Sequence, residues 1–150
     1  NGHSHDEFLT AVSEHFKITP GQGSPESARQ IGMYLDGVWH TLSAKEHTHH
    51  NMAVVDALDV AILQRCILEP LLGIKDPRRS KRIEFIGGIR GMSELENKVQ
   101  KKDGSVAFAM YSTSMNELLD VADDDAIMPP KSTWFEPKLR SGLFLNPVLR

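Results

Sequence analysis

A short proline-framed segment near the C-terminus carries the side chains best suited to hold a small anion. Lys131, Ser132 and Thr133 follow a Pro-Pro pair, and Glu136 and Arg140 come shortly afterwards. Cations offset the charge of a phosphoryl or carboxylate group and hydroxyls orient it, while a carboxylate such as Glu136 could orient a cation or act as a base. Prolines fix φ and remove backbone donors. We therefore expect a semi-rigid loop that binds an anion.

The same segment contains an aromatic pair, Trp134 and Phe135. Aromatic side chains anchor many protein interfaces, so the pair could bind a partner protein. It could equally be buried as a structural clamp, with Lys131, Lys138 and Arg140 merely solvated.

A glycine-rich turn at residues 87–91 is the second place suited to an anion. The alternating residues 82–86 predict a strand before it, and Ser93 with Glu96 predicts a capped helix to about Lys101 after it. Such a junction presents free backbone N–H groups and the positive end of a helix dipole. The glycines could also serve a plain tight turn, because neither the Walker nor the dinucleotide pattern is present. The candidates are Gly87, Gly88, Arg90 and Gly91.

The next elements would place these groups at one sheet edge. Residues 106–111 are apolar and predict a central strand buried on both faces, and Ser114 with Glu117 predicts a capped helix. Strand, helix, strand and helix in succession imply a right-handed crossover and parallel strands. Because ligands bind at the carboxyl ends of such strands, we expect Arg90 and the hydroxyls of residues 112–114 to face one cleft.

The N-terminal half predicts packing elements. A capping box at Ser4 opens a helix from about His5 to His15, and Asp36-Gly37 joins strands 30–35 and 38–43 in a hairpin with a type I′ turn. Residues 20–25 are expected to form a loop between this helix and the hairpin. A buried helix opens at Val55 or Asp56 and stops at Pro70. The fold class expected is α+β: a small mixed sheet with a β-hairpin and a β-α-β-α unit, packed on three or four helices.

Metal binding is not expected. His47, His49 and His50 could bind a metal, but no fixed helix or hairpin frames them, and we favour a solvated loop. The carboxylates of residues 123–125 point in different directions at a helix end, so solvation is favoured over magnesium. Cys66 lies in an apolar helical run and is expected to be buried.

The totals limit the possible partners. The 150 residues fit one domain, 1–150, and a net charge of −3 with a pI near 6.2 gives no overall attraction to nucleic acid or an anionic membrane. There is no long apolar run and no signal-peptide pattern, so a cytoplasmic protein is expected. The chain opens with Asn1-Gly2 rather than Met, which suggests an excised domain of a longer protein.

Several motifs resemble the bacterial and archaeal family called domain of unknown function 1015, in its C-terminal region. The quoted segments are Met33-Tyr-Leu-Asp-Gly-Val-Trp39, Asp59-Val-Ala-Ile-Leu-Gln64, Ile67-Leu-Glu-Pro-Leu-Leu-Gly73, Lys81-Arg-Ile-Glu-Phe-Ile-Gly-Gly-Ile-Arg-Gly91, Ala107-Phe-Ala-Met-Tyr-Ser-Thr113 and Met128-Pro-Pro-Lys-Ser-Thr-Trp-Phe-Glu-Pro-Lys-Leu-Arg-Ser-Gly142.

The resemblance implies that full-length members join this region to an N-terminal portion similar to ParB, sulfiredoxin and the free serine kinases. That portion carries an Asp-Gly-His-His-Arg or Asp-Gly-Asn-His-Arg motif. Here the Asp-Gly pairs are followed by Val38 and Ser105, so the motif is absent. A role in serine or phosphoserine phosphotransfer, with a nucleotide and magnesium in the full-length protein, is what the resemblance implies. The isolated domain is expected to be inactive.

Two functions remain open. The domain could supply an anion-binding surface to a phosphotransfer site shared with its own N-terminal domain. It could instead be a non-catalytic module that binds a small anionic metabolite or a partner protein.

Overall fold

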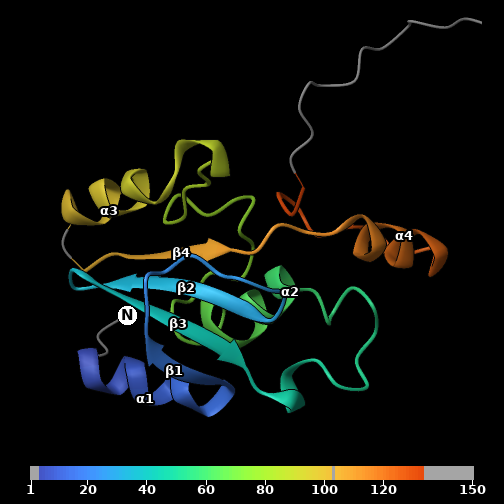
Figure 1. The fold of residues 1–150 in the computed structure, drawn as a ribbon, viewed down its shortest axis with the longest axis horizontal. Helices are drawn as coiled ribbons and strands as arrows, with labels where there is room; N and C mark the ends of the chain where they lie inside the picture. The colour runs from blue at the N-terminus through green and yellow to red at the C-terminus, as the bar shows by residue number, and fades with distance from the viewer. Residues whose placement is uncertain (1–3, 103, 134–150) are drawn as a thin grey trace, which may run out of the picture.

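The fold is built on a four-stranded antiparallel sheet with strand order β1-β3-β2-β4, shown in Figure 1. The structure is a computed structural model that describes residues 4–102 and 104–133. The strands are β1 (Phe16–Pro20), β2 (Gln30–Leu35), β3 (Val38–Ala44) and β4 (Val106–Met110). The helices are α1 (His5–His15), α2 (Asp59–Leu63), α3 (Met92–Gln100) and α4 (Met115–Asp123). The expected α+β class is confirmed.

The first helix has the predicted bounds and cap. Ser4 accepts a hydrogen bond from the backbone N–H of Glu7, whose side chain accepts one from the backbone N–H of Ser4. This reciprocal pairing satisfies donors that a helix start leaves free. Phe8 and Val12 are the buried residues of α1 and fix its inner face.

The hairpin of β2 and β3 is also confirmed. Asp36 and Gly37 have φ angles of 47° and 83°, the positive values that a type I′ turn requires at both central positions. Strand β1 was missed, because Phe16 continues the apolar spacing of α1 and Pro20 suggested only a loop. Proline is tolerated there because Pro20 ends a strand at the sheet edge.

The core lies between one face of the sheet and two helical segments. Alternate residues Ile31 and Met33 of β2 share this face with Leu42 of β3. Both α1 and the segment from α2 onward pack against them. The buried residues of this core are Phe8, Val12, Phe16, Ile31, Met33, Leu42, Ile62, Leu63, Cys66, Ile67, Leu68 and Ile74.

The central helix is shorter than expected. It begins at Asp59 rather than at Val55 or Asp56, because Leu58 has an extended backbone and the residues before it form turns. From Gln64 to Leu68 it continues as η2, a π-helical segment, and ends before Pro70. Cys66 is buried there, as predicted.

The predictions of a parallel β-α-β-α unit and of a mixed sheet are wrong, because all the strand pairs of the sheet are antiparallel. Residues 82–86 form no strand, although they alternate in sequence. Glu84 instead accepts a 2.6 Å hydrogen bond from Lys98 of α3. Strand β4 pairs antiparallel with β2 and lies at the sheet edge, so it is not a central strand buried on both faces.

The last described helix, α4, extends away from the sheet beyond the carboxyl end of β4 (Figure 1). Its capping box is confirmed: Ser114 accepts from the backbone N–H of Glu117, and Glu117 accepts from the backbone N–H of Ser114. The apolar sequence of residues 143–145 predicts a further short strand, and these residues lie outside the described part of the chain.

Candidate functional site

A small pocket of about 70 Å³ lies where the carboxyl end of β4, the start of α2 and the loop after α4 meet. Apolar side chains line part of it, including Leu58 and Met110. Its polar lining is formed by Asp59, Ser112, Thr113, Glu117, Lys131 and Ser132. The pocket therefore combines cationic, anionic and hydroxyl groups from four separate segments of the chain.

Hydrogen bonds hold the loop that brings Lys131 to this pocket. The hydroxyl of Ser132 donates to the carbonyl oxygen of Pro129 at 2.6 Å, and the hydroxyl of Thr113 donates to the carbonyl oxygen of Ser132 at 2.8 Å. Lys131 itself has a φ of 62°, a left-handed conformation that few non-glycine residues adopt. The turn is thus tied directly to the residues that follow β4.

An ion pair between Arg29 and Asp59 lies beside the pocket. The backbone N–H of Arg29 donates to both carboxylate oxygens of Asp59, at 3.0 and 3.1 Å, and its guanidinium donates to Oδ1 at 2.8 Å. Glu117 lies 3.6 Å from the same guanidinium. The Asp59 side chain is only 9% exposed. Burying a carboxylate is costly unless it is paired and hydrogen-bonded, and this one is both.

Sequence reasoning missed this ion pair. The available signal was Asp59 itself, an acidic residue at the start of an otherwise apolar helical run. Nothing in the local pattern of Arg29 indicated its role, because its partner lies thirty positions away.

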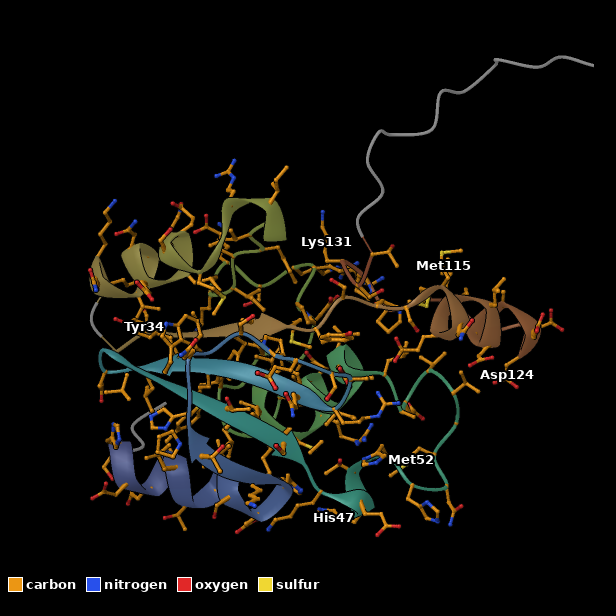
Figure 2. All side chains as sticks on the ribbon, viewed as in Figure 1. Tyr34, His47, Met52, Met115, Asp124 and Lys131 are labelled. Atoms are coloured by element: carbon orange, nitrogen blue, oxygen red, sulfur yellow. The ribbon has the colours of Figure 1, made fainter. Side chains whose placement is uncertain are left out.

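The carboxylates of the pocket are satisfied within the protein, whereas its lysine is not. Asp59 is bonded to Arg29, and Glu117 accepts from the backbone N–H and the hydroxyl of Ser114 at 2.8 and 3.0 Å. Within residues 4–102 and 104–133, the Lys131 ammonium makes no hydrogen bond or ion pair, and Figure 2 shows it beyond the end of β4. Its charge is available to an external anion.

The predicted glycine turn lines a much broader, open groove, which shares residues 110–113 and 131–132 with the small pocket. Gly87, Gly88 and Gly91 line this groove, as do residues 131–133. The groove is too wide to count as one binding site for a small anion. Arg90 lines neither the groove nor the small pocket, so the structure does not place it with residues 112–114.

The turn also differs locally from the predicted helix start. Residues Gly88–Arg90 form η3, a single 3-10 turn, and the N-cap of α3 is Gly91 with a φ of 74°. Ser93 lies inside the helix rather than capping it, which corrects the prediction. A glycine cap provides no side-chain oxygen for the helix N–H groups.

Four other candidates, Trp134, Phe135, Glu136 and Arg140, lie outside the described residues. Among the residues that are described, no group of three or more His, Cys, Asp or Glu side chains could hold a metal ion. Burial raises the pKa of the Cys66 thiol, and the nearby charge of Arg65 opposes this only in part.

Residues 1–61 match the model of a family described as Protein of unknown function (DUF1015). Over these residues the chain is similar to the DUF1015 family. The DUF1015 match extends from α1 through β3 to the first turn of α2, and it includes both Arg29 and Asp59. No curated protein and no solved structure matches the chain. In the described part of the chain, no helix has the length and apolar character needed to cross a membrane.

Proposed function

We propose that this chain is a C-terminal domain that binds a small phosphate- or carboxylate-bearing metabolite in the pocket at the carboxyl end of β4. The observation that carries the proposal is the Lys131 ammonium, which lines the pocket without a partner among the described residues. A lysine ammonium that makes no ion pair, beside a hydroxyl group, attracts and orients an anion. The exposed Ser112 supplies such a hydroxyl, whereas the hydroxyl of Ser132 already donates to the carbonyl oxygen of Pro129.

The Arg29–Asp59 ion pair supports this assignment through its position rather than by direct binding. Because Asp59 is neutralised by Arg29, it does not oppose the approach of an anion as a free carboxylate would. Glu117 keeps its charge, but it accepts hydrogen bonds from Ser114 and lies 3.6 Å from the Arg29 guanidinium. We propose that these pairs fix the pocket walls while Lys131 contacts the ligand.

In the full-length protein the pocket would serve a phosphotransfer reaction, shared with an N-terminal domain and directed at serine or phosphoserine. A lysine offsets the charge of a transferring phosphoryl group, so its loss should slow transfer by orders of magnitude. Lys131→Ala in the full-length protein should therefore lose phosphotransfer while keeping its fold. Full activity in that variant would refute the catalytic part of the proposal.

Ligand binding can be tested on residues 1–150 alone by thermal-shift measurements. Phosphoserine, serine, inorganic phosphate and a nucleotide with magnesium are the probes, each added in excess. A ligand that binds only the folded state raises the melting temperature. Stabilisation by phosphoserine or phosphate but not by serine would support an anion site, and stabilisation by none of them would count against it.

A second candidate is a non-catalytic module that docks a partner protein. Two apolar side chains of α4 favour it: Met115 is 62% exposed and Leu119 is 54% exposed. Figure 2 shows Met115 on the outer side of the helix that leaves the sheet. Exposed apolar groups of this kind commonly mark protein interfaces. A chain that ignores every small ligand, but loses partner binding in Met115→Ser, would favour this function.

A further inference from the structure

A pair of histidines meets outside the pocket, where the end of α1 approaches the turn that follows β3. His15 is the last residue of α1, and His47 lies in η1, the 3-10 turn Glu46–Thr48 that follows β3. Their ring nitrogens, Nδ1 of His15 and Nε2 of His47, are 3.2 Å apart, and the ring planes are inclined by 50°. In Figure 2, His47 lies beside the C-terminal end of α1.

Two hydrogen bonds from Lys45 hold the two histidines in this arrangement. The backbone N–H of Lys45 donates to the carbonyl oxygen of His15 at 2.9 Å, and its ammonium donates to the carbonyl oxygen of Ser13 at 2.7 Å. These two hydrogen bonds hold Lys45, at the start of the loop of residues 45–51 that contains His47, against the end of α1. The sequence alone suggested a solvated loop without a frame, whereas the fold supplies one.

The turn that carries His47 is also held at Thr48. Thr48 is buried, and its hydroxyl donates to the carbonyl oxygen of Lys45 at 2.6 Å. The carbonyl oxygen of Thr48 in turn accepts a 2.6 Å hydrogen bond from the guanidinium of Arg65. His47 therefore lies on a turn that is held from both sides, which reduces the ordering cost of binding a ligand.

We propose that His15 Nδ1 and His47 Nε2 form a two-histidine site for Zn²⁺ or a similar divalent transition metal. Zinc binds imidazole nitrogen at about 2.0–2.1 Å, so two nitrogens on one tetrahedral ion lie about 3.3 Å apart. The 3.2 Å separation matches that spacing. Borderline metals favour imidazole, whereas magnesium and calcium favour oxygen. Two protein ligands leave the remaining positions to water or to a ligand from a partner.

The other two histidines of the same loop contact partners of their own. His50 lies 3.9 Å from Glu46, and His49 contacts the hydroxyl of Thr48. Without metal, one ring N–H donates to the other ring nitrogen, so metal binding must displace that proton.

The test is calorimetric titration of residues 1–150 with Zn²⁺ near neutral pH. We expect one equivalent of metal to bind, and we expect His15→Ala and His47→Ala each to weaken that binding tenfold or more. His50→Ala is the matched control, because it removes a histidine from the same loop outside the pair, and its affinity should equal that of the unaltered chain. Circular dichroism of each variant checks that the fold is retained.

A second measurement follows the ring nitrogens themselves. In nitrogen-15 NMR spectra, Zn²⁺ should shift Nδ1 of His15 and Nε2 of His47, with smaller changes at the other nitrogen of each ring. Absence of binding would overturn the proposal, as would equal affinity in all three variants. Loss of binding in His50→Ala with retention in His15→Ala would overturn it too, because the metal would then lie at Glu46 and His50.

Discussion

Asp59 accepts hydrogen bonds from both the backbone and the guanidinium of Arg29, at 3.0 and 2.8 Å on its Oδ1 atom. The pair joins the first residue of α2 to the residue that precedes β2. Since Arg29 adopts a left-handed backbone with φ of 69°, the contact also holds a conformation that few side chains prefer. This one relationship ties the sheet to the central helix beside the candidate pocket.

Removing the carboxylate should destabilise the protein. Asp59→Ala would leave the Arg29 N–H without its acceptor and the guanidinium with only Glu117 beside it, and we expect a loss of about 2–3 kcal/mol in the free energy of unfolding. Urea denaturation measures it. Asp56→Ala, which alters an exposed carboxylate three positions earlier, is the control and should change stability by less than about 0.5 kcal/mol. Equal effects in the two variants would mean that the ion pair contributes nothing.

A close backbone approach should make Gly32 intolerant of any side chain. A Cβ atom at this position of β2 would overlap the carbonyl oxygen of Gly23, whose loop crosses that face of the sheet. We expect Gly32→Ala to destabilise the fold by about 1–3 kcal/mol or more, because the neighbour is backbone and cannot rotate away. Gly88→Ala is the matched control, since a Cβ there meets nothing within 4 Å. Thermal melting of both variants provides the comparison.

Stability should fall in mild acid partly through His40. Burial lowers the pKa of His40 below its ordinary value of 6.5, and the charge of His5 adds a smaller effect in the same direction. The unfolded chain therefore takes up the proton at a higher pH than the folded chain. The contribution of His40 is complete above its unfolded pKa and is lost as the pH falls through the folded pKa.

The measurement compares urea unfolding at about pH 7.5 and about pH 5. The unaltered chain should lose more stability between these conditions than His40→Gln does. The same loss in both proteins would show that His40 stays solvated and does not contribute.

The single cysteine should react slowly in the folded protein. Cys66 is 5% exposed, and burial raises the pKa of its thiol, so little of the reactive thiolate is present near neutral pH. Labelling with a thiol reagent should be slow in buffer and fast in urea, followed by absorbance. Fast labelling under native conditions would mean that η2 opens readily or that the thiol is accessible.

The elements that could be predicted from the sequence are those fixed by local chemistry. The capping boxes at Ser4 and Ser114 and the turn at Asp36-Gly37 each depend on residues within four positions of one another. These three signals were confirmed, whereas the equally local pattern of Ser93 and Glu96 was not, because α3 begins at Met92 with Gly91 as its cap.

Elements set by distant contacts were predicted less well. The alternating residues 82–86 satisfy a strand pattern, but no strand of the described sheet pairs with them, and Glu84 is instead bonded to Lys98 of α3. Strand β1 needs its partner β3 to be recognised, because the five residues Phe16–Pro20 carry little pattern of their own. Pairing across the chain decided both cases.

The candidate site shows the same division. Lys131 and Ser132 were singled out by their residue types. They line one pocket with Ser112 and Thr113, two of the hydroxyl residues that were expected in a cleft after the strand. Arg90 was expected in that cleft through a parallel crossover, and it lines neither the pocket nor the groove because the crossover does not exist. The Arg29–Asp59 pair could only be found in three dimensions.

The most direct test of the proposed function is phosphoserine binding by residues 1–150, measured by calorimetric titration for the unaltered chain, Lys131→Ala and Lys17→Ala. Lys17 is an exposed lysine on β1 and outside the pocket, so its variant removes the same charge elsewhere. We predict that Lys131→Ala weakens binding at least tenfold, equivalent to about 1.4 kcal/mol, while Lys17→Ala binds as the unaltered chain does. Equal affinity of the two variants, or no binding by the unaltered chain, would contradict the anion site.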